Sequence, residues 1–117
     1  MPERYLYPRT VRLLRKSDFD QVFSKGKKVW GPHFIGYLAE AGGTETRLGL
    51  VVSRKVGNAV TRNRMKRLIR EFFRHHQMCF PAGTELIVVA RVSSSSLTGS
   101  QCIGELQRMF GPWLHNA

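Results

Sequence analysis

The amino-acid sequence predicts an α+β fold, a two-layer sandwich in which helices pack on one sheet. Residues 59–76 and 98–110 place apolar side chains at helical spacing. Residues 47–53 alternate apolar and polar side chains, as a half-covered strand does, and residues 86–90 form a short apolar run typical of an inner strand. The 117 residues are expected to form a single domain around one core.

The N-terminal half is predicted to begin with an extended segment and a short helix. Residues 1–16 contain two prolines and are expected to be extended. Ser17 is the expected N-cap of the helix, and Gly26 is expected to end it. Residues 27–40 predict strand, so two or three strands are expected before the central helix.

The C-terminal half is predicted to contain two helices separated by the apolar strand. Asn58 is a suitable N-cap for a helix over residues 59–76. Thr98 and Gln101 have the spacing of a capping box at the start of the last helix. That helix is expected to end before residues 111–117, which form a short tail.

The chain has an excess of positive charge that is concentrated in two segments. Nineteen Lys and Arg residues against eight Asp and Glu residues give a net charge of +11 and a pI of about 10.7. Residues 1–28 and 47–74 hold all but two of the basic residues. Because such an excess makes a folded domain repel itself, we expect a polyanionic partner, with nucleic acid favoured over an acidic membrane surface.

The sequence predicts neither a membrane span nor an export signal. No stretch is apolar for long enough to cross a bilayer, and the basic N-terminus lacks the apolar centre of a signal peptide. Cys79 and Cys102 are isolated, which favours reduced thiols over a disulfide or a metal site. We therefore expect a cytoplasmic protein with no membrane partner.

The predicted helix at residues 59–76 combines a buried stripe with a basic face. Arg62 and Arg64 lie near its N-terminus, where the helix dipole disfavours a cation by up to about 1 kcal/mol. A solvated surface is the alternative interpretation, but such a face usually carries acids at i+4, and Glu71 is the only acid among residues 62–74. The pattern therefore indicates contacts with phosphate groups. The buried stripe is predicted to contain Met65, Leu68, Ile69, Phe72 and His76.

Motifs that would make the chain an enzyme by itself are missing from the sequence. It has no obvious acid pair, HExxH motif, nucleophile motif or phosphate-binding glycine loop. His75 and His76 adjoin but project about 100° apart on a helix, and His33 and His115 have no identifiable partner. A self-sufficient nuclease is thus a less favoured hypothesis than a structural or ribosomal RNA-binding protein.

Residues 53–71, SRKVGNAVTRNRMKRLIRE, resemble the protein subunit of bacterial ribonuclease P. They contain the Arg-Asn-Arg helix signature of that family at residues 62–64, together with the Lys, Gly, Asn and Ala residues that precede it. The resemblance covers roughly residues 5–110, with further similar stretches at residues 12–13, 18–26, 47–50 and 89–91.

The resemblance implies a fold and an activity. The implied fold is an αβββαβα arrangement similar to the second domain of ribosomal protein S5, with a left-handed βαβ crossover around the central helix. The implied activity is that of ribonuclease P, a ribonucleoprotein that hydrolyses one phosphodiester bond to remove the 5′ leader from precursor tRNA. The implied catalyst is the RNA subunit with bound Mg²⁺. The protein, expected to be monomeric in a 1:1 complex and to bind no cofactor itself, holds that RNA and the single-stranded leader.

The resemblance also implies roles for individual residues. Those implied to contact the RNA subunit are Arg62, Asn63, Arg64, Lys66, Arg67 and Arg70. Those implied to line the leader-binding cleft are Phe19, Phe23, Phe34, Tyr37, Arg54, Lys55 and Asn58. A basic groove with aromatic platforms suits a single strand, because stacking is worth about 1–3 kcal/mol per base. Core packing is the alternative for Phe19 and Phe23, and Tyr37 can face either side of its strand.

Overall fold

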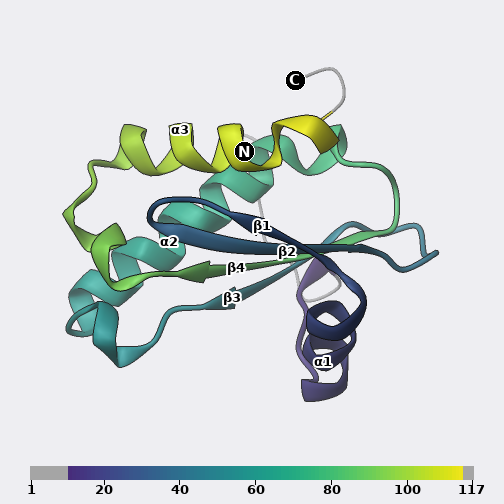
Figure 1. Ribbon diagram of the computed structural model, residues 1–117, viewed down its shortest axis with the longest axis horizontal. Helices are drawn as coiled ribbons and strands as arrows, with labels where there is room; N and C mark the ends of the chain where they lie inside the picture. The colour runs from purple at the N-terminus through teal and green to yellow at the C-terminus, as the bar shows by residue number, and fades with distance from the viewer. Residues whose placement is uncertain (1–10, 115–117) are drawn as a thin grey trace, which may run out of the picture.

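In the computed structural model, which describes residues 11–114, three α-helices and four strands follow one another in the order α, β, β, β, α, β, α (Figure 1). This order confirms the predicted α+β class and the αβββαβα arrangement. The elements are α1 (Lys16–Lys25), β1 (Lys27–Trp30), β2 (Phe34–Glu40), β3 (Arg47–Val51), α2 (Ala59–His76), β4 (Thr84–Ala90) and α3 (Gly99–Phe110). Short 3₁₀ turns connect several of them, including one at Arg54–Val56 directly before α2.

The four strands form one mixed sheet in the order β1-β2-β4-β3. Strand β2 pairs antiparallel with both β1 and β4, whereas β3 runs parallel to β4. Because α2 joins the parallel neighbours β3 and β4, these three elements form the βαβ crossover that the family resemblance implies. The apolar run at residues 86–90 lies in β4, between two neighbouring strands, as its composition predicts.

The sheet has one covered face and one half-covered face. Helices α2 and α3 pack on one face, and α1 lies on the other (Figure 1). Side chains alternate accordingly along β2: Leu38 belongs to the core beneath α2 and α3, whereas Tyr37 packs in the smaller cluster beside α1. Since α1 has only ten residues, it leaves part of its face of the sheet open.

Helix α2 is held to the sheet by the predicted stripe. Met65, Ile69 and Phe72 are buried, and Phe73 is also completely buried, so the stripe is one residue wider than predicted. At the helix start, the Asn58 side-chain carbonyl accepts the Thr61 N–H at 2.9 Å, which confirms the predicted cap. The two remaining stripe positions, Leu68 and His76, are half-buried.

One local prediction, the N-cap of the first helix, is wrong, and the strand prediction for residues 27–40 is made more precise. Helix α1 begins at Lys16, one residue before the predicted cap Ser17, and Arg15 occupies the N-cap position without a side-chain cap bond. Residues 27–40, predicted to be strand, form the two strands β1 and β2, because the chain reverses between Trp30 and Phe34. With β3 this gives three strands before α2, within the predicted two or three. Pro32 lies in that reversal and has no N–H to donate to a ladder, which explains the break.

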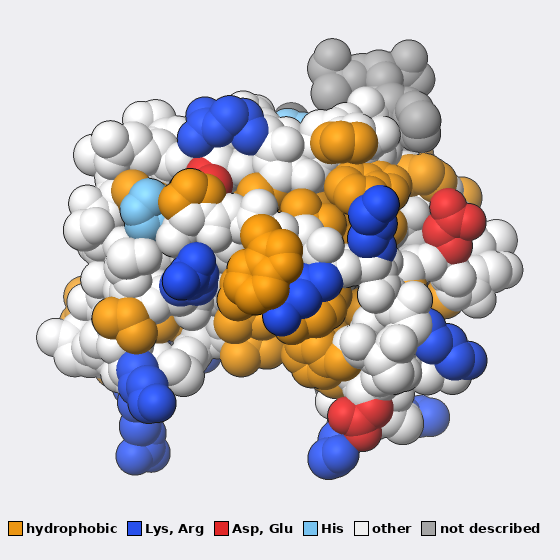
Figure 2. Space-filling view, viewed as in Figure 1, with side chains coloured by type: hydrophobic (Ala, Val, Ile, Leu, Met, Phe, Trp, Pro, Cys, Tyr) orange, Lys and Arg blue, Asp and Glu red, His pale blue; other side chains and the backbone are white. Residues whose placement is uncertain are grey.

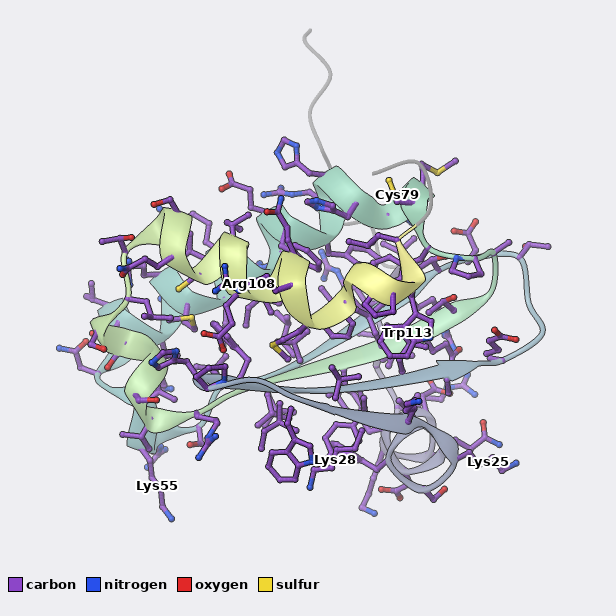
Figure 3. The ribbon with its side chains drawn as sticks, turned by 45° about the horizontal axis from the view of Figure 1, so that its top comes forward. Lys25, Lys28, Lys55, Cys79, Arg108 and Trp113 are labelled. Atoms are coloured by element: carbon purple, nitrogen blue, oxygen red, sulfur yellow. The ribbon has the colours of Figure 1, made fainter. Side chains whose placement is uncertain are left out.

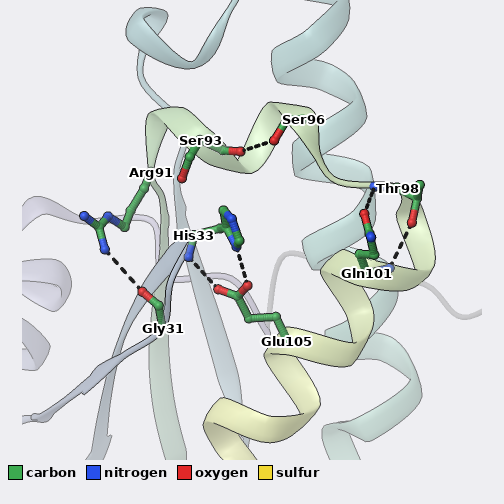
Figure 4. A network of polar contacts seen from close by, with 8 residues as sticks. All are labelled: Gly31, His33, Arg91, Ser93, Ser96, Thr98, Gln101 and Glu105. Carbon is green, nitrogen blue, oxygen red and sulfur yellow. Dashed lines mark hydrogen bonds and ion pairs between the residues drawn. The ribbon is translucent and has the colours of Figure 1, made fainter.

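A buried carboxylate fastens the β1–β2 turn to α3 (Figure 4). Glu105, which is 3% exposed, accepts the backbone N–H of His33 at 2.7 Å, and its other oxygen lies 2.7 Å from His33 Nδ1. Arg91 adds a hydrogen bond to the Gly31 carbonyl oxygen at 3.3 Å. His33 therefore has a partner, Glu105, that sequence spacing did not identify, because Glu105 is distant in the chain.

The capping box predicted for Thr98 and Gln101 is present at the start of α3.

Residues 11–114 contain neither a disulfide nor a helix that could span a membrane. Neither Cys79 nor Cys102 is in a disulfide, and burial raises the pKa of the Cys102 thiol. Over the same residues, each helix is too short or too polar to pass through a bilayer.

Candidate nucleic-acid interface

The basic face of α2 combines exposed and partly anchored side chains. Asn63 and Arg67 are exposed, whereas Lys66 and Arg70 are half-buried along the side of the helix. Within residues 11–114, Arg67 has no hydrogen-bond or ion-pair partner, so its whole guanidinium group is available to an external anion. The helix thus presents positive charge that the fold itself does not neutralise.

Three arginines of this face are oriented by backbone carbonyl groups. Arg62 Nε donates to the Gly57 carbonyl oxygen at 3.1 Å, and Arg64 Nη2 donates to the Leu97 carbonyl oxygen at 2.8 Å. Arg70 Nε donates to the carbonyl oxygen one helical turn before it at 3.2 Å. Each guanidinium has five N–H donors, so one such bond fixes its direction and leaves the other donors free for phosphate. Arg64 therefore has a structural role that the sequence did not predict.

The aromatic residues of α1 meet the open face of the sheet. The Phe19 and Phe23 ring centroids are 6.3 Å apart, and Phe23 meets Tyr37 edge-on at 4.8 Å. Phe23 is 39% exposed, while Phe19 is half-buried against Gly49. A Cβ on Gly49 would lie 2.7 Å from the Phe19 ring, so this glycine makes room for it. Phe19 thus has a packing role as well, and Phe23 and Tyr37 offer accessible aromatic surface.

The prediction that Phe34 lines this cleft is wrong. Phe34 is completely buried and belongs to the core beneath α2 and α3. Side chains alternate along a strand, so Phe34 and Tyr37, three residues apart, necessarily lie on opposite faces of β2. With no exposed surface, Phe34 cannot stack on a base.

One hollow brings one aromatic residue of α1, Phe19, and the basic residues of α2 together. It lies between the segment before α1, strand β3 and the side of α2. Residues assigned from the sequence to two different tasks, Phe19 on one side and Asn63, Lys66 and Arg70 on the other, share this hollow. Its full lining is Arg12, Leu13, Leu14, Phe19, Leu50, Asn63, Lys66 and Arg70.

The residues that precede α2 extend the basic surface. Arg54 and Lys55 are exposed in the 3₁₀ turn after β3. Asn58 is also exposed, and its side-chain carbonyl oxygen caps α2. Figure 3 shows Lys55 on the same side of the sheet as Lys25 and Lys28, away from α3. In Figure 2, Lys and Arg side chains flank hydrophobic ones across the face in front of β1. The surface is therefore positive and apolar at once, as single-stranded nucleic acid requires.

The carboxylates of the described chain are not arranged to hold a metal ion. No group of three or more His, Cys, Asp or Glu side chains within residues 11–114 has the required proximity. Glu85 is paired with Arg47, whose guanidinium also lies 3.8 Å from Asp18, and Glu105 is paired with His33. The buried carboxylates of Glu85 and Glu105 are thus each held by a basic side chain.

Comparisons with known proteins identify the family of the chain. The family model for ribonuclease P matches residues 7–113. The ribonuclease P protein component of Halalkalibacterium halodurans is 40% identical over 96 residues, which span 81% of each chain. That of Geobacter sp. strain M21 is 39% identical over 105 residues, or 90% of each chain. The solved Staphylococcus aureus RNase P protein superposes with a TM-score of 0.81 at 33% identity, covering 87% of this chain and 94% of that one. The chain therefore belongs to the ribonuclease P protein family.

Proposed function

We propose that this chain is the protein component of a ribonuclease P ribonucleoprotein, which removes the 5′ leader from precursor tRNA in the cytoplasm. The observation that carries the proposal is the hollow in which Phe19 faces the basic side of α2. The hollow places Phe19 of the leader set beside Asn63, Lys66 and Arg70 of the RNA-subunit set. A chain bound to an RNA subunit through α2 can therefore hold a second strand close to it.

The basic face of α2 is proposed to bind the RNA subunit. Arg62 and Arg64 lie near the helix N-terminus, where the positive end of the helix dipole and the guanidinium groups both attract an anion. Arg67 adds an unpaired guanidinium farther along the helix. Contacts of this kind depend on phosphate and not on base identity, so they anchor and orient the subunit.

The face beside α1 is proposed to hold the single-stranded leader. Phe23 and Tyr37 offer ring surface on which bases stack, and Arg54 and Lys55 lie where positive charge would follow the backbone. Stacking is tolerant of base identity, since every base has an aromatic face. The protein would therefore accept leaders of different sequence.

Catalysis is proposed to belong to the RNA subunit with its Mg²⁺, and the protein to form a 1:1 complex with that RNA. Bound Mg²⁺ supplies an activated water and stabilises the leaving oxygen. What the chain contributes is fixed positive charge: a net +11 neutralises phosphates that otherwise require more cations. The RNA with its protein is thus expected to need less Mg²⁺ than the RNA alone.

The test is cleavage of precursor tRNA by the RNA subunit at a series of Mg²⁺ concentrations, with and without this chain. We expect the protein to restore cleavage at Mg²⁺ concentrations where the RNA alone is inactive. Binding of the RNA without any stimulation of cleavage would contradict the proposal and leave a structural RNA-binding role.

A further inference from the structure

An exposed tryptophan lies at the edge of the sheet, on the face that carries α1. Trp30 ends β1 and is 63% exposed, more than Phe23 at 39%. Large aromatic side chains are the most costly to leave in water, because they carry the most apolar area. Trp30 belongs neither to the stretches that carry the family resemblance nor to the residues proposed to line the leader cleft, so neither explains its exposure.

The strand register places Trp30 at one end of a row of apolar side chains. Trp30 pairs with Ile35, Ile35 with Val89, and Val89 with Val51. Val51 and Val89 pack in the cluster beside α1, so the row lies on that face, and its last three members are half-buried. It crosses the whole sheet from Trp30 to the end of β3, close in sequence to Arg54. Trp30 is thus continuous with the proposed leader cleft.

Lys28 supplies a positive charge between two aromatic rings. Its Nζ lies 4.1 Å from the Trp30 ring centroid and 5.6 Å from that of Tyr37, its cross-strand neighbour. Within the described residues, no carboxylate forms an ion pair with Lys28. Figure 3 shows Lys28 projecting on the side of the sheet away from α3. An ammonium group of this kind attracts an anion. The two adjacent rings provide flat, apolar surface beside that positive charge.

We infer that Trp30 and Lys28 form a further nucleotide subsite for single-stranded RNA, in which a base stacks on the part of the exposed Trp30 ring that Lys28 does not cover and a backbone phosphate meets Lys28. The inference rests on the proposed function, since the occupant is one nucleotide of the 5′ leader. Charge complementarity favours RNA over an apolar protein partner, because the ring is bordered by an unpaired lysine. Continuity with Tyr37 favours the leader over the RNA subunit, whose proposed contacts lie on α2.

The experiment measures the affinity of the holoenzyme for precursor tRNA with a leader of about eight nucleotides and for mature tRNA without a leader. Trp30→Ala is expected to weaken precursor binding by about 5- to 150-fold, the range for loss of one stacked base. Trp30→Phe is expected to recover most of the loss because it keeps a ring. Binding of mature tRNA is expected to be unchanged.

Met78→Ala is the matched control, since Met78 is 93% exposed and lies after the C-terminal end of α2. Equal melting temperatures of the variants exclude unfolding as the cause. If the unmodified holoenzyme prefers the leader-bearing substrate and Trp30→Ala leaves that preference unchanged, the subsite is refuted while the proposed function stands. An equal loss with mature tRNA also refutes it and assigns Trp30 to other RNA. If the unmodified holoenzyme has no preference for the leader, leader binding itself fails.

Discussion

Replacing Arg67 with alanine is expected to weaken the complex with the RNA subunit about tenfold or more, the value of one charged hydrogen bond. The slope of log affinity against log salt concentration is expected to fall by about one, because one phosphate contact is lost. Arg67 suits this test because it is exposed and has no partner among the described residues, so the free protein loses nothing. Arg64 suits it less, since Arg64→Ala also removes the bond to the Leu97 carbonyl oxygen.

Arg108→Ala is the control with the same change of net charge. Arg108 is exposed in the last turn of α3, a helix that carries none of the residues proposed to bind RNA, and lies on the opposite side of the sheet from Lys55 (Figure 3). Its loss is expected to weaken the affinity for the RNA subunit only slightly, through the overall electrostatic field of the protein. The slope of log affinity against log salt concentration is expected to stay nearly constant. Equal effects of the two substitutions would contradict a specific α2 interface and indicate attraction by net charge alone.

Two phenylalanines assigned to the cleft from the sequence are expected to behave in opposite ways on replacement by alanine. Phe34→Ala is expected to lower the free energy of unfolding by about 3–5 kcal/mol, because the ring is completely buried. Phe23→Ala is expected to cost only about 1 kcal/mol, the value of its edge-on contact with Tyr37. Urea unfolding of the free protein, at one fixed sulfate concentration, measures both.

Leader affinity supplies the other half of this comparison. Phe23→Ala in the assembled holoenzyme is expected to weaken binding of leader-bearing tRNA by about 1–3 kcal/mol, through loss of one stacking platform. Phe34→Ala, measured where the variant remains folded, is expected to leave the leader's contribution unchanged. A leader defect in folded Phe34→Ala with none in Phe23→Ala would contradict the placement of the two rings.

The features that could be predicted from the sequence are those determined by neighbours along the chain. The cap at Asn58, the buried stripe of α2 and the capping box at Thr98 depend on spacings of a few residues. The inner strand is predicted by its composition. The Arg-Asn-Arg signature lies within one helix, so its position outside the buried stripe of α2 followed once the stripe was known.

The features that could not be predicted depend on contacts between distant segments. The bond between His33 and Glu105 joins residues 72 positions apart, and no local pattern marks it. The Trp30–Lys28 pair is recognisable only when the register of β1 with β2 is known. Phe34 is different: the alternation of a strand already excludes that it and Tyr37 share one face, although it does not say which of the two is buried.

We propose that this chain makes its ribonucleoprotein recognise the 5′ leader of precursor tRNA. The most direct measurement is the ratio of dissociation constants for mature and precursor tRNA, determined for the RNA subunit alone and for the RNA with this protein at equal ionic conditions. We predict that the protein raises this ratio by tightening the binding of precursor tRNA about tenfold or more, through stacking and phosphate contacts made only by the leader. A protein that tightens both substrates equally, and leaves the ratio unchanged, would contradict the claim.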